Sequence, residues 1–233
     1  MQQVQSEAKM SSAASCDGDI YRRVKHPMHK AEKYLNRPPA KHAAEMALID
    51  RAVEYVAAKT PQSVDRGFLD APCGVGRATI YLAQKGYAAT GVDLGDGAVS
   101  VARAQVEQSG IEAVIDQADL FALPYKEQQF TAVLCFRFIH HMPTAEYRQK
   151  IITELCRVAH DYVLISYLSP WSFTSIKRKL RQKISGETQV QNSIPLKEIE
   201  GYFSNADFVK VADFARMPLV HTLHIAVFKR CAG

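Results

Sequence analysis

The 233-residue chain is long enough for one α/β domain with a sizeable core, and its 47% hydrophobic and 23% charged residues are ordinary globular values. No stretch approaches about eighteen consecutive apolar residues, and the N-terminus lacks the apolar core of a secretory signal. The five cysteines are scattered and never spaced as CxxC, which argues against a zinc site or disulfide framework and fits a reducing cytoplasm. The net charge of +5 allows an anionic partner without demanding nucleic acid.

Taken in chain order, residues 1–19 are rich in Gln, Ser and Ala and predict a flexible leader before a domain over 20–233. After Pro38-Pro39, apolar residues recur at spacings of three and four and predict a helix with one apolar face. This apolar stripe consists of Met46, Ile49, Val53 and Val56. A buried strand is then expected over 67–71, followed by a glycine-containing turn and a helix near 78–84.

The rest of the chain alternates between the two kinds of element. Strands are predicted over 88–93, 112–117, 130–136, 161–167, 209–214 and 221–229, and helices near 98–108, 145–158 and 196–206. The final two strands have no helix between them, which is typical of an antiparallel hairpin. The pattern therefore predicts an α/β fold with a doubly wound, mostly parallel, seven-stranded sheet that ends in an antiparallel hairpin.

The strongest local motif is Leu69-Asp-Ala-Pro-Cys-Gly-Val-Gly76, at the junction of a strand and a helix. Glycines there let the backbone approach a ligand, although a turn alone also explains them. Asp93 ends the second strand and Asp119 follows the third, so three acids with Asp70 are expected at the carboxyl ends of adjacent strands. A carboxylate accepts two hydroxyl hydrogen bonds, so a ribose diol suits Asp93.

The glycine pattern narrows the choice of nucleotide. A dinucleotide site continues as GxGxxG, whose third glycine allows close packing of helix and strand. Thr79 occupies that position here, which disfavours NAD and an NAD-linked dehydrogenase. The P-loop signature GxxxxGK[ST] is also absent, which argues against most nucleotide hydrolases.

With these motifs the chain resembles the class I S-adenosylmethionine (SAM)-dependent methyltransferases, over about residues 30–168. It looks most similar to the small-molecule group (methyltransferase type 11) that includes the quinone-biosynthesis methyltransferases. The resemblance lies in the glycine motif, in Gly91-Val-Asp93, in Gln117-Ala-Asp119-Leu120 and in Phe136-Arg-Phe-Ile-His-His-Met142. It implies a Rossmann-like fold, SAM as cofactor and S-adenosylhomocysteine (SAH) as product.

The resemblance also implies which residues bind the cofactor. Asp93 would hold the ribose, Leu94 would pack on the adenine, and Asp119 would contact the adenine amino group. Arg37 would meet the SAM carboxylate, and Cys73 is interpreted as a small packing residue. The full expected set is Asp70, Ala71, Cys73, Gly74, Gly76, Asp93, Leu94, Asp119, Leu120, Phe136 and Arg37. No metal site is apparent in the sequence.

The catalytic and acceptor-binding candidates follow the fourth strand. His140 and His141 are candidate general bases because histidine titrates near neutral pH, with packing and helix capping as the alternative roles. Arg137 could hold an anionic acceptor or form a plain salt bridge. The tetrad [DNS]-P-P-[YFW] of amino-methyltransferases is absent at 135–138, which argues against DNA bases and protein glutamines as acceptors.

Two regions are expected to set specificity. Residues 20–60, with Tyr34, would form N-terminal helices that act as a lid, as such segments do in the family. A basic insert over 169–195 contains Trp171 and Lys177, with five basic residues in the seven positions from Lys177 onward. As a helix this segment could meet phosphate, an anionic membrane or a partner protein, or be a solvated basic helix.

The resulting hypothesis is methyl transfer from SAM to a small or medium-sized acceptor, on oxygen. The layout of the basic insert loosely resembles that of bacterial methyltransferase-like proteins associated with envelope saccharides, which adds an anionic saccharide as a possible acceptor. The alternative is a SAM-binding regulatory or scaffold protein that acts through its basic insert. The expected location is the cytoplasm, with peripheral contact at the inner face of the membrane as a further option.

Overall fold

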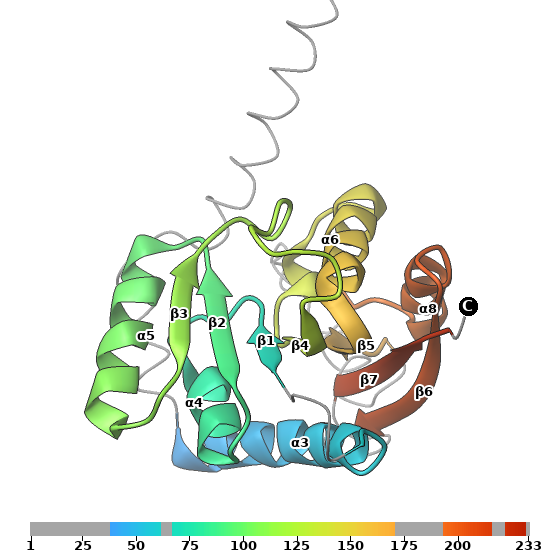
Figure 1. The fold of residues 1–233 in the computed structure, drawn as a ribbon. Helices are drawn as coiled ribbons and strands as arrows, with labels where there is room; N and C mark the ends of the chain where they lie inside the picture. Colours follow the sequence, from blue (N-terminus) through green and yellow to red (C-terminus); the bar gives the residue numbers. More distant parts are fainter. Residues whose placement is uncertain (1–37, 62–66, 171–192, 216–221, 232–233) are drawn as a thin grey trace, which may run out of the picture.

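The computed structural model describes residues 38–61, 67–170, 193–215 and 222–231. Within these ranges the chain folds into a layered arrangement of one sheet covered by helices (Figure 1). The leader, residues 20–37 of the 20–60 segment and most of the basic insert lie outside the described residues. The same holds for four of the predicted site residues, Tyr34, Arg37, Trp171 and Lys177.

The helices and strands follow the predicted order, with labels as in Figure 1. The helices are α3 (Pro39–Ala57), α4 (Arg77–Gln84), α5 (Asp96–Ser109), η1 (Ile139–His141), α6 (Ala145–Val158) and α8 (Leu196–Ser204). The strands are β1 (Phe68–Asp70), β2 (Ala89–Asp93), β3 (Val114–Gln117), β4 (Phe130–Cys135), β5 (Ala159–Leu168), β6 (Phe208–Ala215) and β7 (Leu223–Arg230).

The seven strands form one sheet in the order β3-β2-β1-β4-β5-β7-β6. Strands β1 to β5 pair in parallel, whereas β7 runs antiparallel to both β5 and β6. The predicted α/β fold with a mostly parallel sheet and an antiparallel final hairpin is confirmed.

The strand order reverses between β1 and β4. From β1 the sheet continues to β2 and β3 on one side, and from β4 to β5 on the other. In an open α/β sheet, the connections on the two sides of such a switch point leave a crevice at the carboxyl ends of the strands. The glycine motif follows β1 and the Phe136-Arg137 segment follows β4, so both predicted site segments border this crevice.

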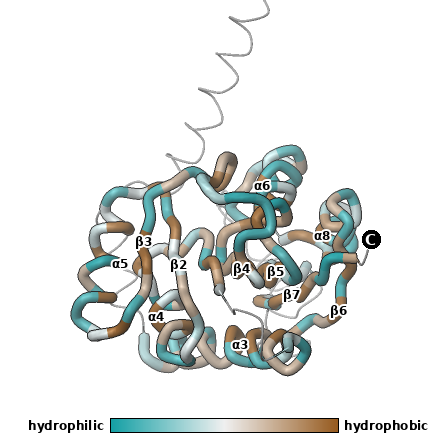
Figure 2. The backbone as a smooth tube through the Cα atoms, in the orientation of Figure 1, coloured by the Kyte–Doolittle hydropathy of each residue, from teal (hydrophilic) through white to brown (hydrophobic). Residues whose placement is uncertain are grey.

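Helices cover both faces of the sheet. Helices α3, α4 and α5 pack on one face, while α6 and α8 pack on the other. The predicted inward-facing residues of α6 are all fully buried, namely Ile151, Ile152, Leu155 and Val158. Figure 2 shows the central strands as the hydrophobic layer, with hydrophilic segments concentrated on the outer turns of the helices.

Candidate functional site

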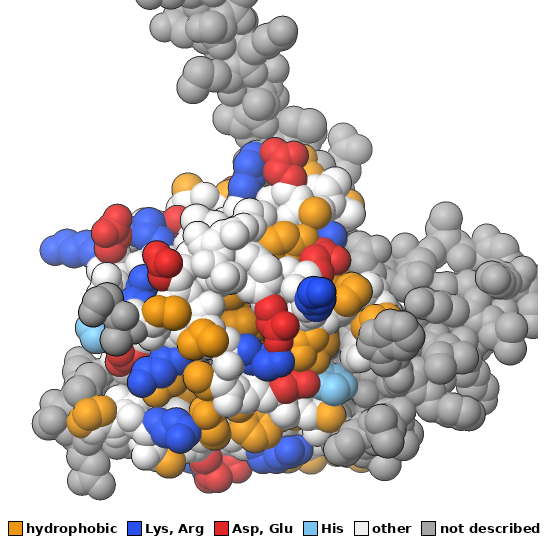
Figure 3. Space-filling view, turned by 90° about the vertical axis from the view of Figure 1, so that its right-hand side faces the viewer, with side chains coloured by type: hydrophobic (Ala, Val, Ile, Leu, Met, Phe, Trp, Pro, Cys, Tyr) orange, Lys and Arg blue, Asp and Glu red, His pale blue; other side chains and the backbone are white. Residues whose placement is uncertain are grey.

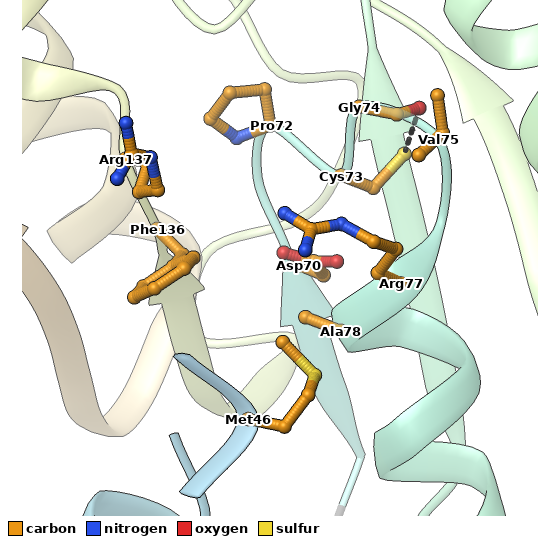
Figure 4. Close-up of a pocket in the computed structure, with 10 residues that line it drawn as sticks. All are labelled: Met46, Asp70, Pro72, Cys73, Gly74, Val75, Arg77, Ala78, Phe136 and Arg137. Atoms are coloured by element: carbon orange, nitrogen blue, oxygen red, sulfur yellow. Dashed lines mark hydrogen bonds between the residues drawn. The ribbon is translucent and has the colours of Figure 1, made fainter. Parts of the chain in front are cut away.

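A pocket opens at the switch point, between the glycine loop and the segment that follows β4 (Figure 4). Its empty space is about 510 Å³, counted out to open solvent. Its walls come from three parts of the chain: α3, the β1–α4 junction and the segment after β4. The lining residues are Met46, Asp70, Pro72, Cys73, Gly74, Val75, Arg77, Ala78, Phe136 and Arg137.

Gly74 and Gly76 of the loop serve different structural purposes. Gly74 lines the pocket with a φ of 57°, and a Cβ added there would meet nothing within 4 Å. Gly76 caps α4 with a φ of 80°, and its missing side chain lets α4 approach Ala102 of α5, whose Cβ would lie 3.2 Å away. Both positions use the left-handed backbone that glycine adopts without strain. Gly74 is therefore the glycine next to the pocket, and Gly76 serves helix packing.

Asp93 ends β2 as a fully buried carboxylate. One of its oxygens accepts the backbone N–H of Gly74 and the other accepts that of Gly95, each at 3.0 Å. The backbone at the end of β2 also contacts the glycine loop, since the N–H of Cys73 donates to the carbonyl of Val92 at 2.8 Å. Asp93 is thereby held in one orientation beside the glycine loop.

Asp70 ends β1 and lines the pocket, although only 1% of its surface is exposed. Its Oδ2 accepts the hydroxyl of Thr79 on α4 at 2.8 Å. The next residue, Ala71, is fully buried and donates its N–H to the carbonyl of Leu134 on β4. Asp70 is therefore fixed between β1 and α4, while Ala71 joins the loop to β4.

The third acid lies beyond β3. Asp119 is half-buried, and its Oδ1 accepts the N–H of Phe121 at 3.0 Å. Leu120 is fully buried in the core on the α6 side, and Leu94 packs against the same core from the end of β2. Because Asp93 pairs in register with Gln117, the three acids follow adjacent strands at one edge of the sheet, as predicted.

A buried carboxylate from α3 holds two arginines of the pocket wall. Glu45 is fully buried, and its two oxygens lie 3.0 Å from Nη1 of Arg137 and 3.5 Å from Nη1 of Arg77. The backbone of Arg137 has a φ of 55°, unusual for a residue with a side chain, and its N–H donates to the hydroxyl of Ser166 on β5. Arg137 thus forms the salt bridge that was one of its two predicted roles, while lining the pocket.

Comparison with known proteins agrees with this geometry. Residues 68–161 match the family described as "Methyltransferase domain". The methyltransferase GfsG of Streptomyces halstedii is 30% identical over 112 residues, which are 47% of this chain and 39% of that protein. A ubiquinone biosynthesis O-methyltransferase of Stutzerimonas stutzeri is 34% identical over 76 residues, 32% of this chain and 33% of the relative. The chain thus spans between a third and two fifths of the length of these relatives.

The fold comparison reaches over nearly the whole chain. The magnesium protoporphyrin IX methyltransferase of Synechocystis, crystallised with SAH, superimposes with a TM-score of 0.70. The match covers 93% of this chain and 95% of that one, at 18% identity. Residues 68–161 are therefore a methyltransferase domain, and the fold is that of the class I SAM-dependent methyltransferases.

His140 and His141, the candidate general bases, differ in exposure. They form the short helix η1, with ring centroids 4.3 Å apart. His140 is fully buried, whereas His141 is half-buried. Of the pair, His141 has the more accessible surface for contact with an acceptor.

Sequence reasoning missed several residues of the pocket wall. Met46 was predicted as a core residue of α3, and Arg77 and Glu45 were not singled out at all. Helix α3 ends at Ala57, well before the motif begins at Leu69, and no local pattern in α3 indicates that its side chains reach the switch point. For Arg77 a signal existed, since a basic residue directly after the glycine loop begins a helix beside the ligand crevice.

A second polar cluster lies at the same edge of the sheet. Tyr167 of β5 donates its hydroxyl to Asp213 of β6 at 3.0 Å, and the same carboxylate oxygen lies 3.1 Å from Nδ1 of His224 on β7. Burial, with the nearby Asp213 carboxylate, raises the pKa of Tyr167, so this phenol stays protonated at neutral pH. The cluster joins the hairpin to β5 beside the end of β4.

Proposed function

We propose that the chain transfers a methyl group from SAM to a small or medium-sized acceptor, on an oxygen atom. The observation that carries this proposal is the buried Asp93, oriented by the N–H groups of Gly74 and Gly95 next to a pocket at the switch point. Two backbone bonds fix the carboxylate, and the further lone pairs of a carboxylate suit the two hydroxyls of a ribose. Leu94 follows Asp93 at the end of β2 and Asp119 follows the neighbouring strand β3, where an adenine would extend from that ribose.

The charges of the pocket wall fit the amino-acid end of SAM. Asp70 supplies a carboxylate for an ammonium group, and Arg77 supplies a guanidinium group for a carboxylate (Figure 4). Arg77 already binds a carboxylate within the chain, that of Glu45, which it shares with Arg137. Gly74 leaves room for close approach of the ligand to the loop backbone. Arg77 is a candidate for the contact with the SAM carboxylate beside Arg37, which the resemblance assigns to it and which lies outside the described residues.

In the proposed reaction the chain mainly orients SAM and the acceptor and excludes water from around them. SAM supplies a methyl group already activated by its sulfonium, so positioning and water exclusion provide much of the acceleration. Phe136, 8% exposed, and Val75, 3% exposed, give the pocket apolar walls that exclude water. A hydroxyl acceptor must also lose a proton, and we assign that role to His141 because of its exposure.

We further propose an anionic acceptor, in contact with Arg137 at the pocket wall. An envelope-associated saccharide is the acceptor class suggested by the basic run that begins at Lys177, beside Trp171. Figure 3 shows acidic and basic side chains interspersed over the described residues on the α8 side, whereas the run from Lys177 to Lys183 contains no acidic residue. This run is therefore our candidate for contact with an anionic surface. Among the described residues, no helix combines the length and the apolar character needed to cross a membrane. The location that we propose, the cytoplasm with peripheral membrane contact, rests on the scattered cysteines and on this basic run.

The test of this function uses SAM labelled in its methyl group. The purified chain is incubated with labelled SAM and fractions of a cell extract, and label transfer to a defined fraction identifies the acceptor class. The Asp93→Ala variant serves as the matched control and should transfer little label. Binding of NAD in place of SAM and SAH would overturn the assignment. SAM binding without any label transfer would favour the alternative, a regulatory or scaffold protein.

A further inference from the structure

Thr79 is the residue by which this glycine loop departs from the dinucleotide pattern, and the structure gives its hydroxyl a partner. Thr79 lies in the first turn of α4 and is fully buried. Its Oγ1 donates to Oδ2 of Asp70 at a distance of 2.8 Å. Asp70 is itself buried, with 1% of its surface exposed. A hydrogen bond to a buried carboxylate is stronger than one between neutral groups, so this contact restrains the Asp70 side chain.

The space for the Thr79 hydroxyl is left by a glycine of β2, the strand beside β1. A Cβ added to Gly91 of β2 would lie 2.5 Å from Thr79 Oγ1, 2.9 Å from Ile115 Cδ1 and 3.0 Å from Cys73 Cβ. Real side chains essentially never approach so closely, so only glycine fits at this position while Thr79 keeps its place. In the dinucleotide fingerprint, the glycine that allows close packing of helix and strand lies on the helix. Here the glycine lies on β2, and the helix position carries a hydroxyl instead.

We propose that Thr79 is a positioning residue for cofactor binding. Its hydroxyl holds the Asp70 carboxylate in the orientation that receives the ammonium group of a bound SAM or SAH. Thr79 acts through Asp70, and Gly91 makes the arrangement possible. The identity of the ligand rests on the proposed function, whereas the Thr79–Asp70–Gly91 arrangement rests on the distances above.

The test compares two ligands across three proteins. SAH and an SAH analogue with hydrogen in place of the amino group are titrated calorimetrically into the wild type, Thr79→Val and Thr79→Ser. Valine keeps the shape of threonine but has no hydroxyl, and serine keeps the hydroxyl. We expect Thr79→Val to weaken SAH binding by about tenfold, since a hydrogen bond to a charged group is lost. We expect Thr79→Ser to stay within about threefold of the wild type. The analogue should bind the wild type and Thr79→Val equally.

Each other result contradicts a defined part of the argument. Equal losses for SAH and the analogue in Thr79→Val would mean a general packing role, and unchanged SAH affinity would mean no role. Either result overturns the inference while the proposed function stands. A wild type that binds neither SAM nor SAH overturns both. Should Thr79→Val fail to fold, Thr79→Ala and Thr79→Ser replace it as a pair, with the same expected selective loss of SAH affinity in the alanine variant.

Discussion

The carboxylate of Asp93 accepts N–H groups from two loops, Gly74 after β1 and Gly95 after β2. Replacing Asp93 with alanine removes both bonds and the proposed ribose contacts. We expect SAM affinity to fall by about 1–3 kcal/mol, measured by titration calorimetry. The control is Asp96→Asn, an exposed acid three residues further on. Unchanged SAM affinity in Asp93→Ala would mean that a different acid holds the ribose.

Gly91 gives a second prediction at the level of one atom. In Gly91→Ala the new methyl group meets Thr79 Oγ1 and Ile115 Cδ1 at distances that require both neighbours to move. We expect the free energy of unfolding to fall by about 1–3 kcal/mol, as for other overpacked cores. Urea denaturation provides the measurement.

Gly201 is the matched control for this substitution. It lies within α8, and a Cβ added there meets nothing within 4 Å. Gly201→Ala should therefore raise the free energy of unfolding by about 0.5–1 kcal/mol, because alanine favours helix. Equal effects of the two substitutions would contradict the close contact described at Gly91.

At the scale of elements, α3 is attached to the pocket wall through Glu45. The side chain is fully buried between Arg77 and Arg137, so the Glu45→Gln change leaves two guanidinium groups without their opposing charge. We expect a loss of about 1–3 kcal/mol in unfolding free energy, since both arginines retain some exposure to water. Thermal or urea unfolding measures it.

The control for Glu45 lies on the same helix. Glu54 pairs with Lys85 at 3.6 Å, but its side chain is 66% exposed. Glu54→Gln should change the unfolding free energy by no more than about 0.5 kcal/mol. If the two variants behave alike, the ion pairs of Glu45 do not fasten α3 to the pocket.

The helices and strands were predictable because each shows a characteristic spacing of apolar residues or a residue that marks its boundary. Helix α6 was predicted with its observed bounds, 145–158, from apolar residues at helical spacing. The strand-end acids followed from the rule that parallel strands place their carboxyl ends at one edge. The Thr79–Asp70 bond was not predictable, because its geometry depends on Gly91 in another strand. The burial of Glu45 was missed for a similar reason, since its partners follow in the chain by 32 and 92 residues.

At the scale of the whole molecule, the sheet topology brings together segments that are far apart in the sequence. Met46 of α3, Asp70 of β1 and Arg137 after β4 line one pocket only because β1 and β4 are neighbours at the switch point. The pocket therefore exists only in the folded chain, and a ligand bound there stabilises that state alone. This link between binding and folding gives a prediction that needs no knowledge of the acceptor.

SAH at one hundred times its dissociation constant should raise the free energy of unfolding by about 2.7 kcal/mol, because it binds the folded state and not the unfolded chain. The measurement is urea unfolding with and without SAH, and NAD at the same concentration should give no change. In Asp93→Ala the same SAH concentration should stabilise less, by the amount that the calorimetric affinities dictate. Stabilisation by NAD equal to that by SAH would show that the pocket does not discriminate between the two nucleotides. Because the Thr79 hydroxyl and the absence of a glycine on α4 are the features that separate the two sites, that result would also remove the structural basis for choosing SAM.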